Sequence, residues 1–458
     1  MNIKTARLGI ALSLLAVNVA APLAWADQHT MPSAPAGIKA NRNLIPPGYV
    51  FNASVPHDLV GAGDDGLQLL VDNLAWNTFI ALNWPVPQPI TQRGVPDRQN
   101  VIGGAVAFNA YGGKPTISPT GPTVWETYKD TADIFLKSAK KPTAFDAPES
   151  IPAACQSLAL ANPQAARRTL WQTTKASDVL SGFQQAFTME PLIDQNGEKV
   201  WYEVKVNRAY YDYVVNNGFY NSNNQKGKTI SFPASSNIAR GEGAVKVKAA
   251  WKVIGGKDNP KNFYTTDALI YDPQTKQCSK KTVGLVGLHI TQKTTQLPQW
   301  MWATFEHVNN APDIVNGVPA PATGVQYNFY NPACTTCPIN TPPSKQKPGA
   351  PTQVARVVPV DSTAALKNSA FQTALQTLRS DNVWQNYMLV NAQWGASPSP
   401  IGTPNQPSFL ANTTMETYLQ QPVVDKKAPH GCINCHGGYA GNTDLDFQIS
   451  DAYPRPKK

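Results

Sequence analysis

Apolar and polar residues alternate with a period of two through the middle of the chain. In residues 244–254 (AVKVKAAWKVI), the apolar side chains at odd positions from Val245 to Val253 fall on one face of an extended strand, and the lysines fall on the other. The same alternation occurs in residues 200–206, 209–215, 268–272, 282–292 and 299–308. It predicts a β-rich region built as an antiparallel sheet or a sandwich.

A helical period precedes this region. Residues 64–84 carry apolar side chains at helical spacing, and Asp64 or Asp65 can cap this helix. Shorter helices are expected within residues 161–187, one of them opening at Asp178. The N-terminal part of the chain is therefore predicted to be mostly helical or irregular.

A helical period also follows the β-rich region. Residues 361–380 form an amphipathic pattern that Asp361 or the serine after it can cap. In residues 412–420, Thr413 and Glu416 have the spacing of a capping box, so a short helix is predicted there as well.

The first 26 residues have the form of an export signal. Lys4 and Arg7 precede an apolar run at 9–20, and the tripeptide AWA at 24–26 has the small-x-small form of a cleavage site. An uncleaved membrane anchor is the alternative, but the run is short for a membrane span. We expect cleavage near Ala26 and a periplasmic mature protein.

One motif near the C-terminus carries specific chemistry. Cys432, Cys435 and His436 form the C-x-x-C-H pattern within APHGCINCHGGYAG at 428–441, which is the pattern for covalent attachment of c-type haem. One helical turn presents two thiols to the haem vinyl groups, and the histidine binds the iron from the proximal side. The sequence therefore predicts one covalently bound haem c.

The position of the motif departs from that in small cytochromes c. Those proteins carry the motif near the start of a domain, and a distal methionine lies far downstream. Residues 437–458 of this chain contain neither methionine nor histidine. Any distal ligand must therefore come from residues that precede the motif.

A C-terminal motif on a β-rich body resembles cytochrome P460 and the β-sheet cytochromes c′. In those proteins a short aromatic segment follows the motif, similar to TDLDF at 443–447. The resemblance covers about 30 residues and implies a five-coordinate iron open to small molecules. No lysine of this chain is assigned to the haem cross-link of cytochrome P460. The whole chain also looks like the large single-haem "cytochrome c family" proteins of Gram-negative bacteria.

Few upstream residues can reach the distal side of the iron. Apart from His29 and His430, the candidates are His57, His289, His307, Met189, Met301, Met388 and Met415. His307 follows an aromatic strand, and we predict that it acts as a distal ligand or proton donor with Glu306 as its acid/base partner. The alternative for His307 is a hydrogen-bonded histidine near a sheet edge. Met415, on the predicted helix before the motif, is the other candidate ligand.

Four cysteines remain besides the two in the motif. They are Cys155, Cys278, Cys334 and Cys337, an even number suited to disulfides in an oxidising compartment. Of the three connectivities, we favour Cys155–Cys278 with Cys334–Cys337. A redox-active dithiol or a metal site at NPACTTCP is the alternative for the second pair.

Net charge adds little to the picture. The chain has a formal charge of +9, and its lysines and arginines are not gathered in a block. Such a charge can favour an acidic partner but gives no nucleic-acid signal. Glycine loops for phosphates, nucleophile elbows and zinc-helix motifs are also absent from the sequence.

These patterns predict an α+β protein with a β-rich central sheet or sandwich, flanking helices and a short C-terminal haem-attachment segment. The predicted divisions are a signal peptide at 1–26, a helical or irregular region at 27–199, a β-rich region at 200–337, a Pro-rich crossing at 338–360, and a helix with the haem segment at 361–458. The predicted function is oxidoreduction by a periplasmic mono-haem cytochrome, acting on a small molecule or a redox partner protein. An electron-transfer partner and a haem-based gas sensor are the alternatives.

Overall fold

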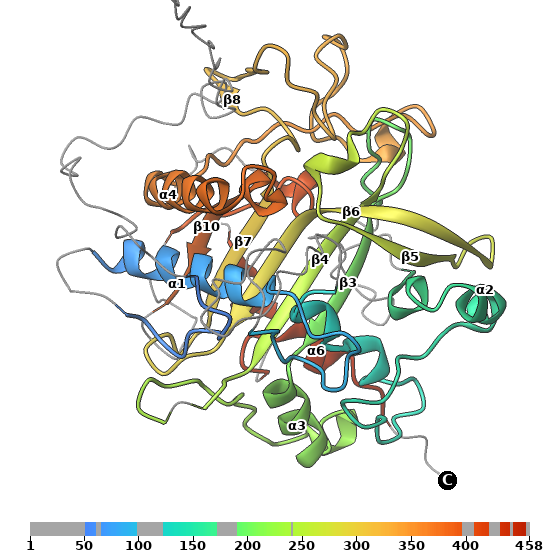
Figure 1. The fold of residues 1–458 in the computed structure, drawn as a ribbon, viewed down its shortest axis with the longest axis vertical. Coiled ribbons are helices and arrows are strands. Elements are labelled where there is room, and N and C mark those ends of the chain that lie inside the picture. The colour runs from blue at the N-terminus through green and yellow to red at the C-terminus, as the bar shows by residue number, and fades with distance from the viewer. Residues whose placement is uncertain are drawn as a thin grey trace, which may run out of the picture. The chain divides into compact units, whose positions relative to one another are not determined.

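A large, curled and mostly antiparallel sheet with flanking helices forms the body of the protein (Figure 1). The computed structural model describes residues 51–60, 66–98, 122–171, 190–239, 241–395, 407–420, 431–439 and 443–454. The described residues belong to one compact unit, Pro32–Lys458. The predicted signal peptide lies outside the described residues.

The helices are α1 (Leu67–Leu82), α2 (Gln156–Ala161), α3 (Arg208–Asn216), α4 (Ser362–Leu378), α5 (Cys432–Tyr439) and α6 (Phe447–Ser450). The strands are β1 (Lys129–Asp130), β2 (Thr169–Leu170), β3 (Trp201–Val206), β4 (Val245–Val253), β5 (Thr265–Asp272), β6 (Gln277–Gln292), β7 (Met301–His307), β8 (Ile314–Val315), β9 (Val318–Pro319) and β10 (Tyr387–Gln393).

The sheet branches at its longest strand, β6. One path runs β1-β3-β4-β6-β5-β2, and β7 and then β10 extend from the second half of β6. All pairs are antiparallel except β2 with β5, and β8 and β9 form a separate small sheet. The main sheet takes strands from three of the segments distinguished in the sequence, because β1 and β2 precede residue 200 and β10 follows residue 361.

One face of the sheet is apolar and is covered by α1 and α4 (Figure 1). The odd-numbered side chains of Val245–Val253 belong to this face, together with Met301 and Phe305 of β7. Trp76 of α1 stacks on Phe371 of α4 at 5.0 Å and packs edge-on against Phe305 at 5.1 Å. We call this side the helix face. It holds the larger part of the apolar core.

The opposite face is covered as well, although β4 contributes lysines to it. Lys246 and Lys252 are 2% and 1% exposed. The Nζ of Lys252 lies 3.2 Å from Asp194, and that of Lys246 lies 2.8 Å from Asp446 near the C-terminus. The loops and the C-terminal segment thus bury this face through ion pairs. We call it the motif face.

Most of the predicted elements are confirmed. The alternating segments form β3, β4, β5, β6 and β7, and Asp361 caps α4 by accepting a hydrogen bond from the Thr363 N–H. The alternation predicted for 299–308 is also seen in β7: Met301 lies on the helix face, and Trp302 packs in the cluster on the motif face.

The segment 209–215 was predicted as a strand and is instead helix α3. Its tyrosines and valines favour a strand locally, but the side chain of Asn207 accepts a hydrogen bond from the Tyr210 N–H and caps a helix. Tyr210 and Val214, one helical turn apart, are both fully buried. The cap and this buried face outweigh the strand propensity.

Three of the predicted helical segments differ in part from what was expected. Gly66, rather than an aspartate, is the N-cap of α1, and the two aspartates lie outside the described residues. Residues 412–420 contain only a 3₁₀ turn, because Glu416 reaches back to the Asn412 N–H at 2.9 Å instead of to Thr413. Within 161–187, the described part holds the end of α2, a 3₁₀ turn and β2. Asp178 lies outside the described residues.

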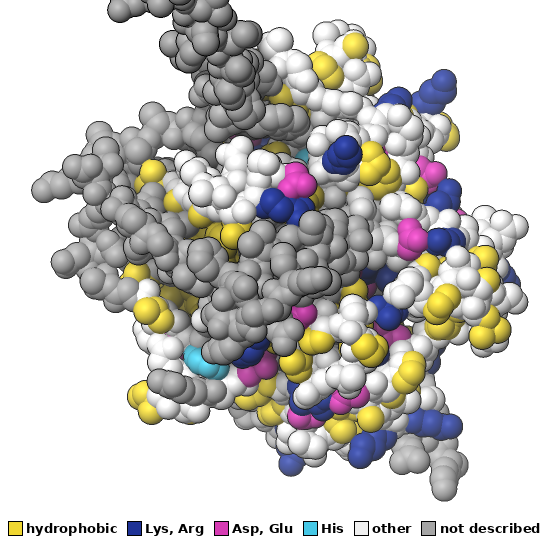
Figure 2. Space-filling view, in the orientation of Figure 1, with side chains coloured by type: hydrophobic (Ala, Val, Ile, Leu, Met, Phe, Trp, Pro, Cys, Tyr) yellow, Lys and Arg dark blue, Asp and Glu magenta, His cyan; other side chains and the backbone are white. Residues whose placement is uncertain are grey.

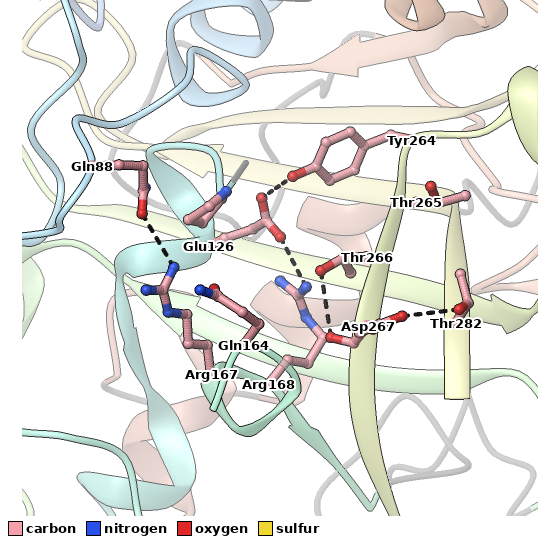
Figure 3. A pocket seen from close by; sticks show the side chains of 11 residues that line it. Gln88, Glu126, Gln164, Arg167, Arg168, Tyr264, Thr265, Thr266, Asp267 and Thr282 are labelled. Carbon is pink, nitrogen blue, oxygen red and sulfur yellow. Dashed lines mark hydrogen bonds and ion pairs between the residues drawn. The ribbon is translucent and has the colours of Figure 1, made fainter. Parts of the chain in front are cut away.

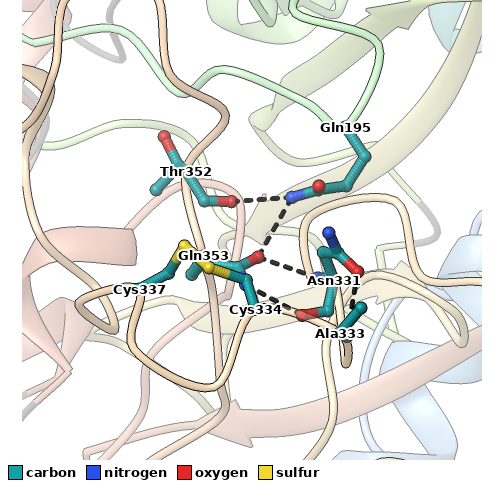
Figure 4. Close-up of a disulfide and its surroundings, with 7 residues drawn as sticks. All are labelled: Gln195, Asn331, Ala333, Cys334, Cys337, Thr352 and Gln353. Atoms are coloured by element: carbon teal, nitrogen blue, oxygen red, sulfur yellow. Dashed lines mark hydrogen bonds between the residues drawn. A yellow bond between two sulfur atoms is a disulfide. The ribbon is translucent and has the colours of Figure 1, made fainter.

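Both predicted disulfides are confirmed. Cys155 is bonded to Cys278, and Cys334 to Cys337. The second bridge closes a tight turn that is held by side-chain amides (Figure 4). Gln353 accepts a hydrogen bond from the Asn331 N–H at 2.8 Å and donates one to its carbonyl at 3.0 Å. These contacts favour a structural role for this pair.

Candidate functional site

The predicted attachment motif forms the helix α5. Its three reactive side chains, Cys432, Cys435 and His436, are spaced i, i+3 and i+4, so they lie on one side of the helix. All three are partly exposed, and both cysteines are present as thiols. This arrangement presents two sulfur atoms and one imidazole together.

The imidazole of His436 is oriented by the chain that follows it. Its Nδ1 lies 2.7 Å from the carbonyl oxygen of Leu445. A carbonyl only accepts hydrogen bonds, so Nδ1 carries the proton, and in the neutral ring Nε2 then keeps its lone pair. Metal-binding histidines are characteristically fixed in this way, with the second nitrogen donating to a carbonyl. The residues present therefore fit the proximal side of a haem.

Two aromatic rings hold the His436 ring in place. Trp302 of β7 lies 4.4 Å away between ring centroids, and Phe447 of α6 lies 4.2 Å away. Phe447 belongs to the TDLDF segment that follows the motif. The imidazole is thus set between the sheet and the last helix.

The motif segment crosses one end of the motif face from β10 to β4. Gln393, Trp302, Thr291 and Lys246 are direct partners across four neighbouring strands. The Ile433 N–H donates to the side chain of Gln393 at 2.7 Å, His436 packs on Trp302, and the Asp446 carboxylate meets Lys246. This row of side chains positions the motif.

Asp444 fixes the turn between α5 and α6. Its carboxylate pairs with Lys293 and accepts a hydrogen bond from the Phe232 N–H at 2.7 Å, and its carbonyl accepts one from the Trp300 indole at 2.9 Å. Burial raises the pKa of the Asp444 carboxyl above its ordinary value, and the charge of Lys293 opposes that shift. Asp444 and Leu445 both have positive φ angles, 56° and 64°, a conformation that aspartate tolerates better than leucine. The turn aims the Leu445 carbonyl at His436.

An apolar cluster completes the attachment of the segment to the body. Ile433 and Ile449 are fully buried and Leu445 is 6% exposed. They pack with α3, with Trp300 just before β7 and with Trp302 of β7. The described part of the C-terminal segment is therefore built into the fold on its sheet-facing side.

His307 lies far from the motif along β7. It is five residues from Trp302, a distance of about 17 Å in a strand, and on the helix face. Its Nδ1 accepts from the Asn309 N–H at 3.1 Å, so Nε2 donates to the Asn262 carbonyl at 2.8 Å. Its ring stacks on Phe263 at 4.5 Å. The structure does not bring His307 to α5, and it favours the alternative of a structural histidine.

Glu306 and Met415 also lie away from the motif. Glu306 is fully buried in an ion pair with Arg356 and accepts the hydroxyl hydrogen of Thr413. Met415 is fully buried in an apolar cluster with Tyr202, and that cluster is separate from the one that contains Ile433. Both side chains are engaged in packing or pairing, and neither contacts His436.

The supporting residues were not identified from the sequence. Trp302 and Lys246 appeared only as parts of strand patterns, and Asp446 appeared only as part of the TDLDF segment. The one available signal was the alternation itself, which placed the lysines of β4 and Trp302 on faces opposite their apolar neighbours. The strand pairing decides which side chains of neighbouring strands lie side by side on one face, and the alternation does not reveal it.

A cavity of about 500 Å³ lies elsewhere in the molecule (Figure 3). Its charged floor contains Glu126 and Arg168, whose side chains are 2.8 Å apart, and the Tyr264 hydroxyl donates to Glu126. Arg168 also pairs at 2.8 Å with Glu203 on the helix face of β3. Glu126 and Glu203 thus share one guanidinium, and Lys205 lies 3.8 Å from Glu203. The cavity does not include the motif.

The chain matches no protein-family model, and no curated protein or solved structure is significantly similar to it.

In the described ranges, no helix is both long and apolar enough to cross a membrane. Three or more His, Cys, Asp or Glu side chains grouped as for a metal ion are likewise not found in that part of the chain. Figure 2 shows Lys and Arg side chains interspersed with Asp and Glu on the face in view.

We predict that Lys246→Met strongly destabilises the protein. Asp446 and Lys246 are 2% and 3% exposed in their side chains, and removing one member of a buried pair leaves an uncompensated charge. The expected loss in the free energy of unfolding is about 3–5 kcal/mol, measured by urea titration. Protease sensitivity of the C-terminal segment should rise with it.

Lys280→Met is the matched control for this change. Lys280 and Asp267 also pair at 2.8 Å on the same sheet, but their side chains are 41% and 36% exposed. An exposed pair contributes about 1 kcal/mol or less. Equal losses in the two variants would contradict a buried anchor at Lys246.

Proposed function

We propose that this chain is an exported mono-haem c-type protein that acts in oxidoreduction. The haem would be bonded to Cys432 and Cys435, and its iron would be bound by His436. The observation that carries this proposal is the hydrogen bond from His436 Nδ1 to the Leu445 carbonyl. Together with the two thiols on the same side of α5, it provides the donor set that covalent haem requires.

Haem bound there would supply a one-electron redox couple and an iron atom able to bind small molecules. The chain's own residues do the rest of the work. Trp302 and Phe447 restrain the His436 ring, and the ion pairs of Asp444 and Asp446 hold its turn on the sheet. A proximal side restrained in this way would keep the imidazole of His436 in a fixed orientation during a redox change.

Export to the periplasm is part of the proposal. Two disulfides support an oxidising compartment, and covalent haem attachment takes place in the same compartment. The export signal predicted at 1–26 is consistent with both. The redox partner or substrate would meet the haem on the side that the sheet does not cover.

The test is the optical spectrum of the purified exported protein, ferric and then reduced with dithionite, with and without carbon monoxide. We expect a haem spectrum that survives denaturing extraction, and a reduced form that shifts with carbon monoxide. A protein without covalent haem would refute the proposal. A low-spin spectrum untouched by carbon monoxide would instead favour the electron-transfer alternative.

A further inference from the structure

A buried histidine lies close to the motif on the same side of the sheet. His289 of β6 pairs directly with Thr304 of β7 and Lys248 of β4. Trp302, two residues before Thr304, is therefore its diagonal neighbour on the motif face, about 7–8 Å away. The ring of Trp302 contacts His436. His289 and His436 are thus both neighbours of one tryptophan.

Two covering segments contact the sheet near His289. The motif segment covers the row of Trp302 and Lys246. In the second segment, Asn412 donates from Nδ2 to the Thr304 hydroxyl and to the Phe305 carbonyl, both at 2.9 Å. Thr304 is the direct partner of His289, so the segment around Asn412 contacts the row of His289 itself. His289 thus lies in the row next to the one that the motif segment covers.

A carboxylate holds the ring of His289. The Oε1 of Glu416 lies 3.3 Å from His289 Nε2, and its Oε2 accepts from the Asn412 N–H at 2.9 Å. The side chains of His289 and Glu416 are each 11% exposed. The nearest cation on the sheet is Lys248, the direct cross-strand neighbour. With Nε2 directed at the Glu416 carboxylate, Nδ1 can donate a second hydrogen bond only when the ring is an imidazolium, the form that pairs with a carboxylate.

Other described residues of suitable chemistry lie elsewhere. Met301 and His307 belong to the helix face, and Met415 belongs to a separate cluster. Met388 pairs with Glu306, four residues from Trp302 and about 13 Å along the strand. His57 lies in a loop whose neighbouring carbonyl, that of Pro56, accepts from Gln292 on the helix face.

We propose that His289, paired through Nε2 with Glu416 as an imidazolium, donates a hydrogen bond from Nδ1 to a small anionic or polar molecule bound at the haem iron. This inference rests on the proposed function. It assigns the substrate class as a small molecule with a hydrogen-bond acceptor next to its iron-bound atom. Glu416 is a positioning residue, because it acts through His289.

The test measures azide binding to the ferric haem protein. In His289→Ala, azide should bind at least about tenfold more weakly, which is the effect of losing one hydrogen bond to an anion. His289→Gln keeps a donor and should recover part of this loss, and Glu416→Gln should lie between the wild type and the alanine variant. The C–O stretching frequency of the reduced carbon monoxide complex should shift in His289→Ala.

Met388→Leu is the matched control. Met388 lies on β10, the strand next to β7, and its partner Glu306 is farther along β7 from Trp302 than Thr304, the partner of His289. It should leave azide affinity and the C–O frequency unchanged. Unchanged or tighter azide binding in both folded His289 variants would overturn the inference. A wild-type protein without covalent haem would overturn the proposed function itself, so the two failures are distinguishable.

Discussion

The variant Cys432→Ala/Cys435→Ala is expected to lose all of the covalent haem that we propose. Thioether bonds can form only at these two thiols, because the other four cysteines are in disulfides. His436 alone would hold haem through a single coordinate bond, on a helix whose three reactive side chains are partly exposed. Such haem would be lost on denaturing extraction. The effect should be complete rather than graded.

The chain contains a close control for this change. Cys334 and Cys337 have the same C-x-x-C spacing as the motif, but no histidine follows them and they form a disulfide. Cys334→Ala/Cys337→Ala should therefore keep the full wild-type amount of covalent haem. Haem staining of denaturing gels, normalised to protein, measures both variants. Equal staining of the two, or equal loss, would contradict attachment at α5.

The fold was predictable where neighbouring residues decide the structure. Alternation identified β4 and β6, and Asp361 marked the start of α4. Prediction failed at α3, where Tyr210 and Val214 satisfy strand and helix patterns equally well and the cap at Asn207 decides between them. Local propensity is a weak guide when a buried face and a cap favour the other conformation.

Within the candidate site, only the motif itself could be predicted from the sequence. The spacing of Cys432, Cys435 and His436 is a local property and could be read directly. Its environment depends on pairing between strands far apart in the chain. Lys246 and Asp446 are 200 residues apart, and no periodicity connects them.

This dependence on strand pairing also explains why the sequence pattern favoured His307 over His289. His307 follows a conspicuous run of aromatic residues, whereas His289 lies within the long apolar strand β6. In the strand register, His289 is the closer of the two histidines to Trp302. His289 is the diagonal neighbour of Trp302, while His307 lies on the other face and at the far end of β7.

The two disulfides are expected to differ in their contribution to stability. Cys155 and Cys278 are 123 residues apart, whereas Cys334 and Cys337 are three apart. A cross-link stabilises chiefly by reducing the entropy of the unfolded chain, and the effect grows with the logarithm of the closed loop. Removing the long-range bridge should cost about 5 kcal/mol, and removing the short one about 2 kcal/mol.

The surroundings of each bridge act in the same direction. Cys155 is fully buried and packs with Leu269, so its bridge joins the region before α2 to the start of β6. The short bridge closes a turn that Gln353 already holds through two hydrogen bonds to Asn331 (Figure 4). Urea titration of Cys155→Ala/Cys278→Ala and Cys334→Ala/Cys337→Ala would measure the difference. If the short bridge proved the more stabilising, strain or structure in the unfolded chain, rather than loop entropy, would control the stability of this protein.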